Sequence, residues 1–145
     1  MVHVLGFTLW LGGGIATMVA GVSAKGFAAA ERLAAYRLIG AIQRMLVGPG
    51  AMAVLLSGLV LAMPYMKQGA VPGWMGLMMI AGILGALGAV TISVPTAAKL
   101  ARLELDARGG LPEAFQMLRK RQILAATIAG GFGLIAMFSV TLGKW

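Results

Sequence analysis

The feature that most constrains the fold is a set of four long apolar stretches that contain no Lys, Arg, Asp or Glu. They cover residues 1–24, 45–66, 68–98 and 123–143. Each stretch can supply the roughly 20 residues that a helix needs to cross a bilayer. Hydrocarbon cannot satisfy open backbone groups, so a span must be a helix or part of a closed barrel. The apolar residues are continuous and do not alternate, which excludes a barrel. The sequence therefore predicts an all-α, transmembrane four-helix bundle.

The composition leaves little room for a soluble domain. Charged residues make up 11% of the chain and hydrophobic residues 60%, whereas soluble domains carry about 25% charged residues. We expect a single integral membrane domain over residues 1–145, with spans at about 2–23, 45–65, 74–98 and 122–142. The chain has no cysteine, which excludes disulfides, thiolate metal sites and cysteine nucleophiles.

The basic residues are concentrated in two segments between spans, 25–44 and 99–121. Only Lys67 and Lys144 fall on the opposite side of the predicted topology. The positive-inside rule therefore places both basic segments in the cytoplasm and both termini outside. We expect segment 25–44 to form a helix at the membrane surface that runs directly into the second span.

The net charge of +8 has a source other than nucleic-acid binding, because the basic residues follow the predicted topology. We expect them to contact anionic lipid headgroups and expect no nucleic-acid partner. The residues predicted to contact headgroups are Arg32, Arg37, Arg44, Arg119, Lys120 and Arg121.

Small residues recur at four-residue spacing on two of the spans. Such residues share one helix face and allow helix backbones to approach closely in lipid. The stripes predicted to pack between helices are Gly13, Thr17 and Gly21 on the first span and Ala81, Gly85 and Ala89 on the third. Pro49 and Pro95 should each bend their helix near the basic side.

Candidate ligands for a metal or haem gather at the predicted outer side. His3 is the only histidine. Methionines predicted at the same depth are Met63, Met66, Met75, Met78 and Met79. Imidazole and thioether sulfur are ligands of Cu(I), and His with Met is also a haem ligand pair. The alternative is that the methionines fill apolar space and that His3 lies in the headgroup layer.

Other chemistry finds less support in the sequence. All four acidic residues lie on the predicted cytoplasmic segments, so the predicted spans lack the buried acid that proton-coupled transporters use. No Ser-His-acid set can form across the membrane. Residues 12–14 (GGG) lie within an apolar span and lack the Lys-Ser/Thr that ends a phosphate-binding loop.

Several short motifs resemble a known group of bacterial membrane proteins. The pattern HVLG at residues 3–6, followed by LWLGG at 9–13, is similar to the opening helix of the copper-resistance protein D-like families. The resemblance continues through Arg32, Arg37 and Arg44 to Pro49-Gly50 and Ser57-Gly58. The protoporphyrinogen oxidase of the HemJ type is distantly similar. The resemblance implies a four-helix bundle in the bacterial inner (cytoplasmic) membrane, with His3 as a candidate haem axial ligand.

These observations favour a small multi-pass membrane protein without catalysis of its own. It would act as an accessory or structural subunit, associated with other membrane subunits or with itself. The alternative is a protein that binds haem b or copper at the outer face through His3. A third possibility, implied by the resemblance, is an enzyme similar to the porphyrin oxidase.

Overall fold

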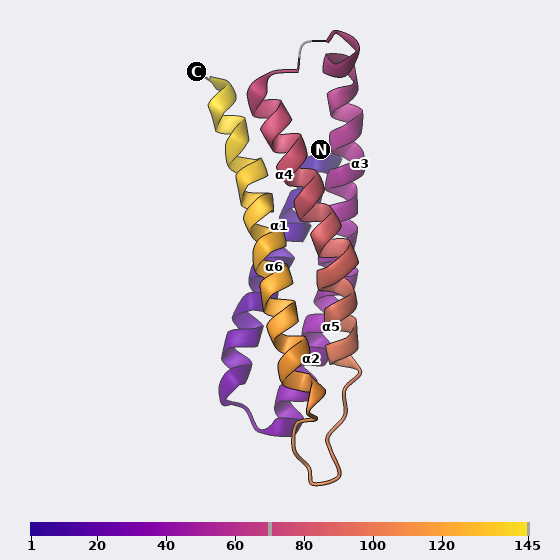
Figure 1. Cartoon of the computed structure of the whole chain (residues 1–145), viewed down its shortest axis with the longest axis vertical. Coiled ribbons are helices and arrows are strands. Elements are labelled where there is room, and N and C mark those ends of the chain that lie inside the picture. The colour runs from indigo at the N-terminus through magenta and orange to yellow at the C-terminus, as the bar shows by residue number, and fades with distance from the viewer. Residues whose placement is uncertain (70, 145) are drawn as a thin grey trace.

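The computed structural model describes residues 1–69 and 71–144, and this part of the chain is all-helical. Four long helices lie side by side, each antiparallel to the next in sequence (Figure 1). The first is α1 (Val2–Ser23) with the short η1 (Ala24–Gly26). The second comprises α2 (Ala29–Ile42), η2 (Gln43–Val47) and α3 (Gly48–Lys67). The third comprises α4 (Gly73–Gly88), η3 (Ala89–Ser93) and α5 (Val94–Ala101). The fourth comprises α6 (Ala114–Ser139) and η4 (Val140–Lys144).

All four helices are long and apolar enough to cross a membrane. Their outward surfaces carry large apolar side chains, such as Val4, Met18 and Leu124, which are all more than 60% exposed. Several buried positions, in contrast, hold polar side chains, among them Gln43 and Gln122. An apolar exterior around a partly polar interior suits a lipid solvent. The structure therefore supports a multi-pass membrane protein, as the sequence predicts.

The ends of the predicted spans differ from the helix ends in the structure. The first span matches α1, but the second helix runs without a break from Ala29 to Lys67 and has 39 residues. The third helix extends from Gly73 to Ala101, and the fourth begins at Ala114 rather than near residue 122. The added turns contain charged residues, which explains why apolar stretches alone placed those ends further inward.

Segment 25–44, which was expected to form a helix at the membrane surface, is helical from Ala29 onward and packs against neighbouring helices. It continues into the second span as predicted, but it does so as part of the bundle. Leu33, Tyr36 and Ile39 are buried in a cluster with Leu100 and Phe115. The Tyr36 and Phe115 rings meet edge to face at 5.1 Å between centroids. This apolar cluster closes the end of the bundle that carries the basic segments, called here the basic end.

The predicted headgroup contacts divide into two groups. Arg32 donates hydrogen bonds to the carbonyl oxygens of Ala24, Lys25 and Phe27, where η1 ends. Arg119 donates from Nε to the Tyr36 hydroxyl oxygen over 3.0 Å. These two guanidinium groups therefore hold the basic end together. The side chains exposed there and free of such bonds are Arg37, Arg44, Lys120 and Arg121.

Two π-helical stretches, η2 and η3, lie beside each other in antiparallel helices. Each is followed after one residue by a proline, Pro49 and Pro95 respectively. A proline lacks the N–H of a regular helix, and its ring collides with the carbonyl four residues earlier. The wider π turn, in which the Gly48 N–H bonds to the Gln43 carbonyl, accommodates this collision. The bends predicted at these prolines therefore coincide with π stretches.

Glycines bring α1 close to α3 and α4 close to α6. A Cβ atom on Gly50 would lie 2.7 Å from the backbone nitrogen of Trp10, and one on Gly85 would lie 2.8 Å from the indole ring of Trp10. Trp10 is buried at the centre of the main core cluster. Of the predicted packing stripes, Gly13, Thr17, Ala81, Gly85 and Ala89 are buried, and Gly21 is half-buried near the Tyr36 hydroxyl.

Candidate functional site

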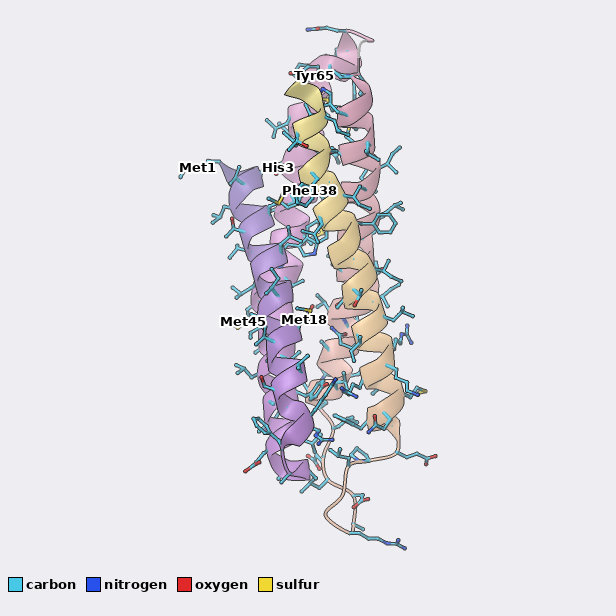
Figure 2. The ribbon with its side chains drawn as sticks, turned by 90° about the vertical axis from the view of Figure 1, so that its left-hand side faces the viewer. Met1, His3, Met18, Met45, Tyr65 and Phe138 are labelled. Atoms are coloured by element: carbon cyan, nitrogen blue, oxygen red, sulfur yellow. The ribbon has the colours of Figure 1, made fainter. Side chains whose placement is uncertain are left out.

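His3 lies in the first turn of α1, beside the middle of α3. Its Nδ1 atom is 3.0 Å from the Ser57 hydroxyl oxygen. The helix α3 continues from Ser57 to Lys67, which is about 15 Å at a rise of about 1.5 Å per residue. Figure 2 shows His3 well below Tyr65 accordingly. His3 was expected level with the ends of the neighbouring spans, and instead lies deeper in the bundle.

The hydrogen bonds around Ser57 define the protonation of His3. The Ser57 hydroxyl donates its single hydrogen to the backbone carbonyl of Ala53, one turn earlier in α3. With that hydrogen on Ala53, the Ser57 oxygen accepts in the His3 contact, which favours the tautomer that carries the hydrogen on Nδ1. We infer that neutral His3 carries its proton on Nδ1 and has an unshared electron pair on Nε2. A histidine that binds a metal commonly uses this arrangement.

A small apolar pocket adjoins His3. Its lining comes from all four long helices and includes Phe7, Gly58, Met78, Met79 and Ala136. The His3 and Phe7 rings meet edge to face at 5.4 Å between centroids. Gly58 suits this position, because a Cβ atom there would lie 3.1 Å from the His3 ring and would press against it. The pocket therefore exists where α3 has no side chain.

The structure brings together only some of the predicted ligands. Met78 and Met79 line the pocket with His3. Met75 is buried one turn away on α4, at 6% exposure. Met63 and Met66 point away from the interior and are 52% and 55% exposed. In the described residues, no three His, Cys, Asp or Glu side chains form a metal-binding group.

The size of the pocket bears on which group it could hold. Its volume is about 30 Å³, room for an ion or a few waters. Pockets for organic ligands of moderate size measure about 300–1,000 Å³. A pocket of this volume gives no support to a porphyrin beside His3. One imidazole and two thioethers do fit the ligand preference of Cu(I).

A second polar feature, which sequence reasoning missed, lies between the His3 pocket and the basic end. Four buried side chains, one from each long helix, are joined by hydrogen bonds: Thr17, Gln43, Ser93 and Gln122. We call this set the polar junction. Both glutamines adjoin basic residues in the sequence, so the sequence alone suggests that they lie at the ends of spans and not in the interior of the bundle. Uncharged amides at two span boundaries are the signal that could have revealed it.

Comparisons with known proteins add no relative. No protein-family model, no curated protein and no solved structure matches the chain. The likeness to the copper-resistance protein D-like families therefore stays a prediction from short motifs.

The His3 tautomer can be measured directly, because the chain has one histidine. In ¹⁵N-histidine-labelled protein in nanodiscs, we expect the neutral ring to show the Nδ1–H tautomer. Ser57→Ala removes the acceptor and should shift the ring towards the Nε2–H form that predominates in free histidine. An Nε2–H ring in the unaltered protein, or no change in the variant, would contradict the assigned hydrogen bond.

Proposed function

We propose that the chain is a multi-pass subunit of the bacterial cytoplasmic membrane, without catalysis of its own. It works by packing its helices against another membrane subunit or a second copy of itself. The observation that carries this proposal is a pair of small residues, Gly12 and Ala16, on the outward face of α1. Both are exposed, and a Cβ atom on Gly12 would meet nothing within 4 Å.

The two faces of α1 differ in how their small residues are used. Gly13 and Thr17 pack inside the bundle, where a Cβ atom on Gly13 would lie 2.9 Å from Val47. Gly12 and Ala16 repeat the same four-residue spacing one position earlier and have no neighbouring helix in the described chain. Small residues at this spacing let a partner backbone approach closely in lipid. The exposed Ile15 flanks the pair.

Association through this face can be tested by photo-cross-linking in intact membranes. We expect benzoylphenylalanine at Ile15 to give a discrete product of higher mass, which mass spectrometry identifies as a second copy or another protein. The same probe at Leu87, exposed on the third long helix, serves as the matched control and should give no such product. Gly12→Leu should weaken the Ile15 product about tenfold, because its side chain would separate the helices.

Equal products from both positions would mean that contact is non-specific. A chain that yields no product at Ile15 and runs as a single copy in mild detergent would contradict the proposed association.

The proposed orientation places the basic end in the cytoplasm and the Lys67–Gly73 connection outside. The charge difference between the two ends supports it, through the positive-inside rule. Both termini then face the outside of the cytoplasmic membrane. Arg37, Arg44, Lys120 and Arg121 remain exposed for contact with anionic headgroups.

Labelling of single cysteines tests the orientation, since the natural chain has none. Gln68→Cys, in the Lys67–Gly73 connection, should react with a membrane-impermeant maleimide on intact spheroplasts. Ala107→Cys, in the connection between α5 and α6, should react only after lysis. The reverse pattern would contradict the proposed topology.

A second candidate function is binding of Cu(I), favoured by the meeting of His3, Met78 and Met79 at one pocket. Nε2 of His3 and the two thioether sulfurs are soft ligands of the kind that Cu(I) selects. The resemblance to the copper-resistance protein D-like families points the same way. Haem b and porphyrin oxidation, which the resemblance also suggests, gain no support from a pocket of about 30 Å³.

Competition with a chromophoric Cu(I) chelator measures this second function. We expect one Cu(I) per chain, with affinity at least tenfold lower in His3→Ala and Met78→Leu. Met66→Leu, on the exposed face of α3, is the control and should bind as the natural chain does. If the control loses as much affinity as the other two variants, the pocket is not the site. A Soret band on the purified protein would favour haem over Cu(I).

A further inference from the structure

The polar junction is buried within the apolar part of the bundle. Thr17 and Gln122 are 7% and 6% exposed, and Gln43 and Ser93 are each 1% exposed. Thr17 comes from α1 and Gln122 from α6, whereas Gln43 and Ser93 belong to the π stretches η2 and η3. In this surrounding, a polar atom without a partner is costly, because lipid offers no hydrogen bond and the side chains are shielded from bulk solvent.

The hydrogen bonds of the junction run in one direction. Gln122 Nε2 donates to the Ser93 hydroxyl over 3.0 Å, and that hydroxyl donates to Gln43 Oε1 over 3.3 Å. Gln43 Nε2 then donates to the Thr17 hydroxyl over 3.1 Å, which donates to the Gly14 carbonyl over 2.9 Å. One atom is left at the start of the chain. Gln122 Oε1 is buried, and no described residue donates to it.

Rotating the amides does not remove this deficit. If both glutamines exchange their oxygen and nitrogen positions, the three bonds between side chains reverse: Thr17 donates to Gln43 in place of the Gly14 carbonyl, Gln43 to Ser93, and Ser93 to Gln122. The Gln122 amide nitrogen then occupies the unpartnered position and has hydrogens without an acceptor. If Gln122 alone rotates, two amide oxygens face the Ser93 hydroxyl, which has one hydrogen to donate. One of the two oxygens is then left without a donor. Every orientation therefore leaves a buried polar group at the junction.

The missing partner must be small and neutral. A cation would satisfy the free oxygen but would lie near Arg119 and Arg121, which are within one turn of Gln122 on the same helix. An anion would face the free oxygen and be repelled by it. Water both donates and accepts, so it completes the chain in either direction.

Buried water in proteins typically bonds to polar groups that would otherwise lack a partner, and Gln122 Oε1 is such a group. We propose that the polar junction is a binding site for at least one structural water molecule, hydrogen-bonded to Gln122 Oε1.

The first test is NMR on full-length protein in nanodiscs, with ¹⁵N-labelled glutamine side chains. We expect the Gln122 side-chain amide protons to show cross-relaxation to a long-lived water, with the sign of a bound molecule. Gln116, exposed on the same helix, is the internal control and should show only exchange with bulk solvent. Absence of any water contact at Gln122, while the junction bonds are intact, would overturn the proposal.

The second test uses thermal stability, and it separates a hydrated oxygen from an unsatisfied one. Gln122→Met removes the Nε2–Ser93 bond in either case. If water completes the junction, the substitution also removes the bonds to that water and should lower Tm by several degrees. If Gln122 Oε1 has no partner, removal of the unsatisfied oxygen offsets loss of the Ser93 bond, and Tm should stay level or rise. Gln116→Met should leave Tm nearly unchanged. A level or raised Tm for Gln122→Met would refute the water site, and the NMR measurement on the natural chain decides the matter if that variant does not fold.

Discussion

Every polar group within the bilayer must find its partner inside the protein, because hydrocarbon offers none. The chain meets this requirement by pairing polar side chains between helices that are distant in sequence. His3 pairs with Ser57 across α1 and α3, and the polar junction links all four long helices. Individual bonds of this kind contribute on average only about 0.6 kcal/mol in membranes. Their value lies in alignment, because each bond forms at one register of its helices.

Close backbone approach at glycines complements these bonds. Gly50 against the Trp10 backbone and Gly85 against the Trp10 indole ring leave no space for a methyl group. Trp10 is thus enclosed by α3 on one side and by α4 and α6 on the others. The glycine contacts set the distance between neighbouring helices, while the polar pairs set their axial register. The His3 pocket depends on both, since Gly58 provides its space and Ser57 orients its imidazole.

The sequence predicted the number and order of the helices because charge-free length is a direct requirement of the bilayer. It predicted the inward position of Gly13, Thr17 and Gly85 because small residues repeat at helical spacing. It did not predict the offset of α1, since the length of an apolar stretch says nothing of how antiparallel helices slide. Hence Met63, Met66, Met75, Met78 and Met79 were all expected near His3, whereas only Met78 and Met79 line its pocket in the structure. The polar junction was not predicted for a related reason, because its four side chains come together only at one axial register of the helices.

The 39-residue second helix is nearly twice the length that a bilayer requires. Its first turns are packed against α5 and α6 by Leu33, Tyr36 and Ile39, so contacts within the protein stabilise them. The long side chains of Arg37 and Arg44 can reach headgroups from more than one depth. A bundle built this way tolerates hydrophobic mismatch, because a thicker or thinner bilayer changes how much of a folded rod is immersed without unfolding either end.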